Sequence, residues 1–175
     1  MANILIMFST TDGHTLEICH YLKQVIERNN NNVSLHPIDE EADVDVESFD
    51  KIVLGASIRY GKHSKQVYRF IARNLQILER KPNALFSVSL VARKSGKNQP
   101  ETNPYFRKFL KQISWQPNKM AVFAGKLNYP IYSFWDKQII RFIMWMTGGP
   151  TNPETVIDYT DWQKVESFGL LIDNM

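Results

Sequence analysis

Hydroxyl groups, a carboxylate and a glycine lie together near the start of the chain, in the stretch Thr10-Thr11-Asp12-Gly13-His14-Thr15. An unbroken apolar run, residues 4–8, precedes this stretch, and apolar residues at helical spacing follow it over 16–26. A turn between a buried strand and a helix directs backbone N–H groups and hydroxyls at one point, where the helix dipole is positive. This arrangement favours an anion such as the phosphate of a nucleotide or flavin. The alternative is an ordinary surface helix capped by Thr11 or Asp12.

The same stretch resembles the flavodoxin phosphate loop, whose pattern is T/S-x-T-G-x-T. Asp12 stands where flavodoxins usually have Thr. A carboxylate beside a phosphate is repulsive unless it turns away to cap the helix. The resemblance implies phosphate contacts from Thr10, Thr15 and the Gly13 backbone, and we expect the whole turn, Thr11, Asp12 and His14 included, to bind the cofactor.

Charge is segregated along this chain of 175 residues, which is long enough for one domain, 1–175, with a sizeable core. Residues 1–50 carry a net charge of −8, residues 51–141 of +15, and residues 142–175 of −4. Such asymmetry indicates an anionic partner for the middle of the chain, and nucleic acid, anionic lipid and an acidic small molecule all satisfy it. The single cysteine, Cys19, excludes an internal disulfide framework. No basic segment or cleavage site precedes Ile4, so we expect no signal peptide.

Strands and helices are expected to alternate along the chain. Apolar runs predict strands at 4–8, 33–38, 51–57, 84–91 and 120–125, and helical spacing predicts helices at 16–26, 67–75, 104–113 and 160–172. Pro37 places the second strand at a sheet edge. This alternation predicts an α/β fold with a five-stranded, doubly wound parallel sheet of order 2-1-3-4-5. Residues 39–50 carry seven acids and are expected to form a solvated connection, since no histidine accompanies them to suggest a metal site.

Three turns are expected to meet at the carboxyl edge of this sheet, at residues 9–15, 57–63 and 89–95. In the second turn Tyr60 can stack on a flat ring and Gly61 allows close backbone approach. The predicted cofactor residues of the second and third turns are Ser57, Ile58, Arg59, Tyr60, Gly61, Ser89, Leu90 and Val91. A flavin fits better than a dinucleotide because the chain lacks G-x-G-x-x-G. The three turns therefore predict a flavin as the cofactor and no metal.

An amphipathic insertion, about residues 126–150, separates the last predicted strand from the final helix. Ser133, Lys137 and Arg141 recur every four residues and form a polar stripe, which Gln138 widens, while the other faces are aromatic and aliphatic. The stretch is too short and too charged to span a bilayer. We expect a helix lying in the membrane interface, with apolar anchors at Trp135, Phe142 and Trp145. The alternative is a helix packed on the core or against a second copy.

Several longer segments resemble the quinone-dependent protoporphyrinogen IX dehydrogenases of proteobacteria: residues 8–15, 55–61, 89–94, 105–110 and 159–162, together with the insertion and its Gly148-Gly149 pair. The resemblance covers essentially the whole chain. It implies an FMN enzyme of haem biosynthesis that oxidises protoporphyrinogen IX to protoporphyrin IX and passes the electrons to menaquinone or ubiquinone. It also implies peripheral attachment to anionic membrane at the cytoplasmic face of the bacterial inner membrane, and no nucleic-acid partner.

Cationic residues on the predicted turns are candidates for holding the propionates of such a substrate. These candidates are Arg59, Lys62 and Arg93, although each is also explained as a solvated surface cation. The hard chemistry belongs to the flavin, so no catalytic side chain is required, and His63 is the one nearby candidate for proton transfer. An electron-carrying flavodoxin and an FMN-dependent NAD(P)H:quinone reductase would share the same flavin slot and stay open as alternatives.

Overall fold

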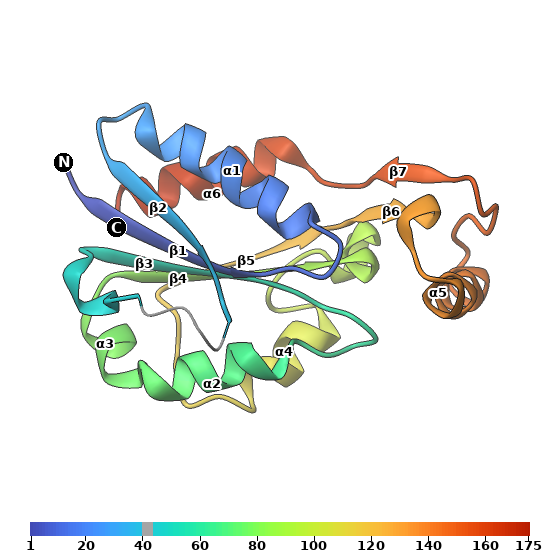
Figure 1. The fold of residues 1–175 in the computed structure, drawn as a ribbon, viewed down its shortest axis with the longest axis horizontal. Coiled ribbons are helices and arrows are strands. Elements are labelled where there is room, and N and C mark those ends of the chain that lie inside the picture. The colour runs from blue at the N-terminus through green and yellow to red at the C-terminus, as the bar shows by residue number, and fades with distance from the viewer. Residues whose placement is uncertain (40–43) are drawn as a thin grey trace.

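The computed structural model describes residues 1–39 and 44–175 and contains a five-stranded parallel sheet (Figure 1). Its strands are β1 (Asn3–Ser9), β2 (Asn32–Pro37), β3 (Lys51–Ser57), β4 (Asn83–Ser89) and β5 (Lys119–Ala124). Their order is β2-β1-β3-β4-β5, and all neighbours pair in parallel. The predicted fold class and strand order are confirmed, including the edge position of β2, where Pro37 removes no ladder hydrogen bond from a central strand.

Helices cover both faces of the sheet (Figure 1). Helices α1 (His14–Glu27) and α6 (Trp162–Asp173) pack on one face, and α2 (Lys65–Arg73), α3 (Leu75–Arg80) and α4 (Pro104–Leu110) cover the other. Each face has its own apolar core, because side chains alternate along every strand. Ile4 and Ile6 belong to the core under α1 and α6, whereas Leu5 and Met7 belong to the opposite core.

Two predicted elements end earlier than the apolar pattern suggests, and the predicted acidic connection contains a short turn. The predicted helix 67–75 ends as α2 at Arg73, and a separate helix, α3, follows Asn74, whose side-chain Nδ2 donates to the Phe70 carbonyl at 3.0 Å. The predicted strand 84–91 ends at Ser89 and continues as a 3₁₀ turn, Leu90–Arg93. The predicted acidic connection contains a 3₁₀ turn, Val46–Ser48, capped by Asp45, and its residues 40–43 lie outside the described part of the chain.

The insertion forms a small ribbon that carries a helix away from the sheet (Figure 1). Strand β6 (Lys126–Asn128) pairs antiparallel with β7 (Val156–Asp158), and a 3₁₀ turn, Tyr129–Ile131, leads from β6 to helix α5 (Phe134–Met146). A third apolar cluster joins the inner face of α5 to the ribbon through Leu127, Tyr129, Tyr132, Ile140 and Met144. Sequence reasoning missed the ribbon because three-residue strands are too short to show a period of two.

Candidate functional site

A cavity of about 580 Å³ opens at the carboxyl edge of the sheet, between the three turns and α5. All the predicted cofactor residues except Gly13 line it. The opposite wall is supplied by α5 and is mainly apolar; its residues are Ile139, Ile140, Ile143, Met144, Met146 and Thr147. The cavity therefore combines a polar end near the first turn with an apolar wall from the insertion.

The first turn is shaped around Gly13, which caps α1 with a left-handed backbone of φ +86°. Its N–H donates to Thr10 Oγ1 at 3.0 Å, and no side chain caps the helix. The interpretation of Thr11 or Asp12 as a helix cap is therefore wrong, and the first N–H groups of α1 lack intrahelical partners. Thr15 Oγ1 is buried and has no hydrogen-bond partner among the described residues. These donors converge on the polar end of the cavity.

Asp12 turns toward the second cofactor turn instead of capping α1. Arg59 Nη2 donates to both carboxylate oxygens of Asp12, at 2.5 and 2.6 Å. Burial raises the pKa of Asp12, and the adjacent Arg59 opposes that shift. The Arg59 guanidinium also lies over the rings of Tyr60 and Tyr132, at 5.7 and 5.3 Å from their centroids. This ion pair ties the first turn to the second and cancels the negative charge that distinguishes Asp12 from threonine.

The second turn is tight and holds Tyr60 at the cavity rim. Residues Arg59 and Lys62 exchange backbone hydrogen bonds at 2.9 and 3.1 Å, and Tyr60 and Gly61 between them have φ angles of +52° and +75°. A Cβ atom on Gly61 would lie 2.8 Å from the Tyr105 ring, so only glycine fits here. The Tyr60 hydroxyl donates to Asp136 in the first turn of α5, and burial together with this hydrogen bond raises the pKa of Tyr60 to about 12.

The third turn connects the sheet to the other end of α5. Ser89 Oγ at the end of β4 is buried and has no partner among the described residues. Arg93 Nη1 donates to the Leu90 carbonyl at 3.0 Å, and Arg93 Nη2 donates to Thr147 Oγ1 at 2.9 Å, just after α5 ends. The two ends of α5 are therefore tied to the cofactor turns by Tyr60 and by Arg93.

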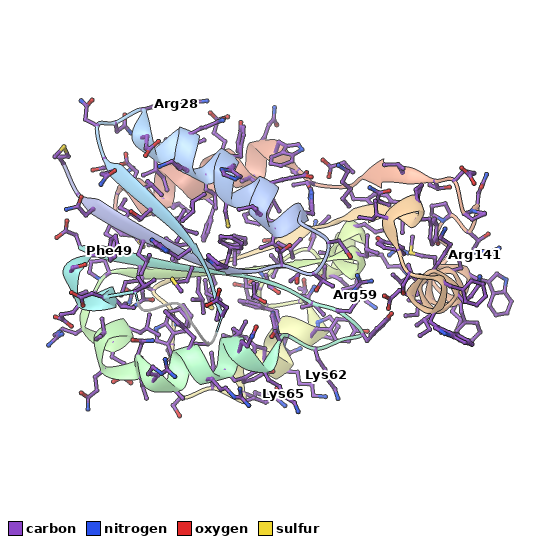
Figure 2. All side chains as sticks on the ribbon, viewed as in Figure 1. Arg28, Phe49, Arg59, Lys62, Lys65 and Arg141 are labelled. Carbon is purple, nitrogen blue, oxygen red and sulfur yellow. The ribbon has the colours of Figure 1, made fainter. Side chains whose placement is uncertain are left out.

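Two of the predicted substrate or catalytic residues lie outside the cavity lining. Lys62 is exposed beyond the second turn (Figure 2). His63 is buried in the core, with Nε2 at 2.8 Å from Ser87 Oγ and its ring 4.2 Å from that of Phe109. Burial lowers the pKa of His63 to about 4, so the ring is neutral at pH 7. The structure gives His63 a packing role and no contact with the cavity.

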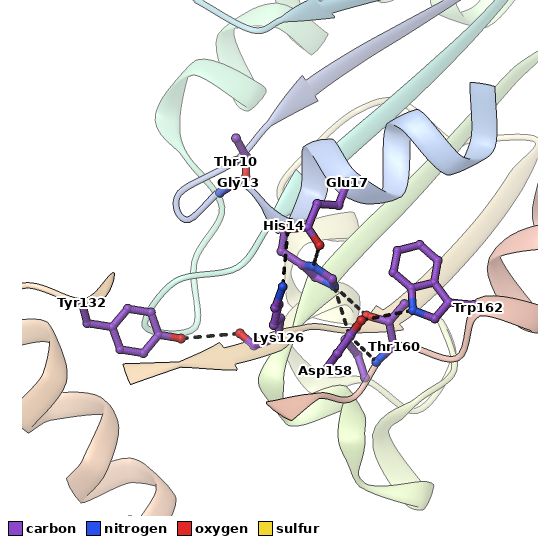
Figure 3. Close-up of polar contacts among 10 residues, drawn as sticks. Thr10, Gly13, His14, Glu17, Lys126, Tyr132, Asp158, Thr160 and Trp162 are labelled. Atoms are coloured by element: carbon purple, nitrogen blue, oxygen red, sulfur yellow. Dashed lines mark hydrogen bonds and ion pairs between the residues drawn. The ribbon is translucent and has the colours of Figure 1, made fainter. Parts of the chain in front are cut away.

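His14 begins α1, but its ring points to the C-terminal part of the chain (Figure 3). Its Nδ1 lies 2.9 Å from Glu17 Oε2, and its Nε2 lies 2.6 Å from Thr160 Oγ1 and 3.6 Å from Asp158 Oδ1. Thr160 in turn donates to the Ala124 carbonyl at 2.9 Å. His14 therefore ties the first turn to the segments that follow β5 and β7.

Helix α5 has an inner polar flank and an outer apolar face. Arg141 Nε donates to the Thr151 carbonyl at 2.8 Å, and Lys137 is half-buried on the same flank. The outward side chains are mostly aromatic or aliphatic (Figure 2), and Trp135 and Trp145 are 74% and 70% exposed. Of the predicted polar stripe, Arg141 thus contacts the segment after α5 and Ser133 is exposed, and the exposed aromatic side chains of α5 leave an apolar surface that is uncovered among the described residues. No helix in the described ranges is long and apolar enough to cross a membrane.

The residues at the polar end of the cavity fit the phosphate of FMN. Two buried hydroxyls, Thr15 Oγ1 and Ser89 Oγ, lack partners among the described residues and line the cavity. A buried polar group without a partner is costly, so a ligand that accepts or donates at these atoms is favoured. Gly13 leaves its side of the turn open, since a Cβ there would meet nothing within 4 Å.

Comparison with known proteins identifies the family. The sequence matches the family described as "Flavodoxin domain" over residues 5–154. It is 40% identical over 164 residues to the protein of Escherichia coli (strain K12) named protoporphyrinogen IX dehydrogenase (quinone), which covers 94% of this chain and 91% of that relative. A Leishmania major protein of the same name is 42% identical over 165 residues, covering 94% and 71%. The chain belongs to the protoporphyrinogen IX dehydrogenase (quinone) family.

Solved flavodoxin structures share the fold of this dehydrogenase family member at low sequence identity. Oxidised flavodoxin 1 of Bacillus cereus has a TM-score of 0.54 and 15% identity, covering 99% of this chain and 98% of that one. A WrbA-like flavodoxin of Agrobacterium tumefaciens has a TM-score of 0.56 and 14% identity, covering 99% and 96%. These likenesses concern the fold alone, and they agree with the predicted flavodoxin-like architecture.

Sequence reasoning missed one charged residue that lines the cavity, Lys126. Its position at the first residue of β6 was not predicted because β6 itself was not. One sequence feature could have indicated that Lys126 lines the cavity. Lys126 directly follows Gly125, the last residue of a predicted strand whose carboxyl end lies at the cofactor edge of the sheet.

Proposed function

We propose that this protein is an FMN-dependent oxidoreductase that oxidises protoporphyrinogen IX to protoporphyrin IX and passes the electrons to a quinone. One observation supports this most strongly: a turn that fits a phosphate and an apolar wall from the insertion line the same cavity. The names of the relatives supply the substrate and the class of acceptor. An apolar tetrapyrrole needs the kind of wall that α5 provides.

The first turn and the ends of β3 and β4 would hold FMN. Thr10, Thr15 and the N–H groups after Gly13 would bind the phosphate, while Tyr60 and Ser89 would contact the rest of the cofactor. FMN, when bound, supplies the two-electron acceptor. The protein's own contribution is to position the substrate, to exclude water with α5, and to pair with the substrate's carboxylates.

Arg59 is the best placed of the predicted carboxylate-binding residues. Asp12 occupies Nη2 of Arg59, and Nε and Nη1 have no hydrogen-bond partner within residues 1–39 and 44–175, so they can meet an incoming carboxylate. Arg93 lines the cavity but uses both Nη1 and Nη2 to hold Leu90 and Thr147, so its role is mainly to position α5. Lys62 lies at the outer rim and would act only on the approach of an anionic substrate.

The outer face of α5 would dock on an anionic membrane. Four large aromatic side chains of α5 are exposed and do not line the cavity: Phe134, Trp135, Phe142 and Trp145. Lys62 and Lys65 are also exposed cations, and exposed cations add attraction to negative headgroups. The inner face of the same helix lines the cavity, so docking would bring a lipid-dissolved quinone close to the cofactor. This contact would place the protein peripherally at the cytoplasmic face of the bacterial inner membrane.

Anaerobic flavin spectroscopy tests the proposed activity. The FMN-loaded protein is mixed with protoporphyrinogen IX in the absence of oxygen, and a quinone is added afterwards. We expect the flavin absorbance to bleach with the substrate and to return with the quinone, with protoporphyrin fluorescence appearing in step. Bleaching by NAD(P)H but not by the porphyrinogen would instead identify an NAD(P)H:quinone reductase, and bleaching by neither would favour an electron carrier.

A further inference from the structure

The first turn supplies no cation to balance the negative charge of a phosphate bound at the polar end of the cavity. A phosphate monoester carries a charge of about −1.5 to −2 at pH 7. Asp12 in the turn and Glu17 one helical turn further on are both acidic. Arg59 cancels the charge of Asp12, but no cation of the first turn itself balances the phosphate. A cation from another element, placed beside α1, would balance the remaining negative charge of the phosphate.

Lys126 reaches this place from the insertion. It lines the cavity as the first residue of β6, and its Nζ lies 3.6 Å from Glu17 Oε1 (Figure 3). That distance is longer than a hydrogen bond, so the ammonium group keeps donors for another oxygen. The Glu17 side chain is 51% exposed, which makes it a weak competitor for the charge.

The backbone holds Lys126 in a defined place. Gly125 N donates to the Ser89 carbonyl at 3.1 Å, and Tyr159 N donates to the Gly125 carbonyl at 3.2 Å. Lys126 lies opposite Asp158 in the antiparallel backbone pairing of β6 with β7. These backbone contacts keep the start of the Lys126 side chain beside the cavity before any ligand binds.

Among the described residues, the other two basic side chains that line the cavity already have partners within the chain, and the remaining donors of Arg59 are assigned above to the substrate carboxylate. Among the described residues that line it, Arg59 bonds both oxygens of Asp12, and Arg93 bonds Leu90 and Thr147. Lysine suits a phosphate as a compact point charge. Thr15 Oγ1 gives an independent sign of a ligand at this end, because it is buried, lines the same cavity and has no partner among the described residues.

We propose that Lys126 binds the phosphate of FMN and supplies the positive charge that the first turn lacks. This inference depends on the proposed FMN function and adds to it a phosphate ligand from the insertion. The insertion would then both form the apolar wall and bind the phosphate. Bound FMN would in turn stabilise the position of the ribbon that carries α5.

The test compares FMN with riboflavin, which has the same ring system and no phosphate. Dissociation constants are measured by flavin fluorescence quenching for the wild type, Lys126→Met, and the control Lys119→Met. Methionine keeps the aliphatic stem of lysine, and Lys119 is an exposed cation at the far end of β5. Circular dichroism checks that each variant is folded.

We expect Lys126→Met to weaken FMN binding by roughly 10- to 100-fold, the usual range for a charged hydrogen bond, and to leave riboflavin binding unchanged. The control should bind both flavins like the wild type. FMN binding should also depend less on salt in Lys126→Met than in the control, which is a second readout that structural damage would not produce.

Two results would overturn the inference. An equal loss for FMN and riboflavin would make Lys126 a wall residue, and unchanged FMN binding would leave it only a partner of Glu17. A wild-type protein that binds no FMN would overturn the proposed function as well, and this outcome is distinct because it appears before any variant is compared.

Discussion

The first turn and helix α5 face each other across one cavity and are built in opposite ways. The first turn is embedded between β1 and α1, and its donors are fixed by Gly13 and by the Asp12–Arg59 pair. Helix α5 stands at the end of a short ribbon, with two of its residues, Ile140 and Met144, buried and most of its apolar face exposed. The contrast supports the proposal that the exposed face of α5 docks on a membrane, since the first turn is enclosed by its own chain and that face is not.

The largest expected effect concerns membrane binding by the exposed aromatic side chains of α5. The triple variant Trp135→Ser, Phe142→Ser and Trp145→Ser should lose at least about 100-fold in binding to anionic liposomes, since each buried aromatic side chain contributes about 1.5–3 kcal/mol. Co-sedimentation measures this loss. FMN binding should be unchanged because these side chains do not line the cavity.

A matched control removes three exposed apolar residues elsewhere, through Met120→Ser, Leu170→Ser and Leu171→Ser. This control should sediment like the wild type. If the α5 variant sediments equally well, the helix face does not dock on the membrane, and a concentration-dependent change in its oligomeric state would assign the face to a second copy instead.

The next prediction tests whether His63, beside the second cofactor turn, is buried in its neutral form in the folded protein. His63 follows the second turn, and its folded-state pKa is lowered to about 4 from an ordinary value of 6.5. The unfolded chain therefore binds more protons as pH falls below about 6.5, and the wild type should lose about 2 kcal/mol of unfolding free energy between pH 7 and pH 5 from this residue. Urea denaturation at both pH values measures the loss.

The variant His63→Gln keeps a polar atom near Ser87 and cannot titrate. Its unfolding free energy should change less between pH 7 and pH 5 than that of the wild type, by about the same 2 kcal/mol. An identical pH dependence in the two proteins would show that His63 is not held neutral in the core.

A smaller effect is expected at the first turn. Thr15→Ala removes the unpartnered buried hydroxyl and should weaken FMN binding by roughly tenfold while lowering stability little, because the folded protein loses no internal hydrogen bond. Fluorescence titration and thermal unfolding measure the two quantities. A large drop in stability with unchanged affinity would mean that Thr15 serves the packing of α1.

The smallest effect is expected at Arg59, which joins the two turns. Arg59→Met should raise the KM for protoporphyrinogen by about threefold to tenfold with FMN still bound, since the side chain is partly exposed. The variant also leaves Asp12 unpaired. Steady-state kinetics of Arg59→Met combined with Asp12→Asn separates the two causes, and full recovery of KM in the combined variant would remove Arg59 from the substrate site.

Sequence patterns were sufficient for the sheet and for the turns that surround the cavity. The run 4–8 is apolar at every position, which suits a strand covered by helices on both sides, and its side chains are buried in the structure. Pro37 marked the edge strand, and the Thr-rich turn before an amphipathic helix marked the anion end of the cavity. These features are local, which is why a short stretch of sequence reveals them.

Contacts between distant segments were decided by the tertiary structure alone. The pairing of Asp12 with Arg59, the burial of His63 against Phe109, and the approach of Lys126 to Glu17 join residues 46 to 109 positions apart. Nothing in their local sequence distinguishes them from solvated or catalytic residues, because a side chain's partner depends on which elements the sheet order brings together. The sequence by itself predicted the five strands of the parallel sheet, their order and the polar turn after the first strand, through periodicity and turn chemistry. The tertiary structure decided which charges are paired, which histidine is buried, and which face of α5 is left open, because burial and pairing exist only once the layers are packed.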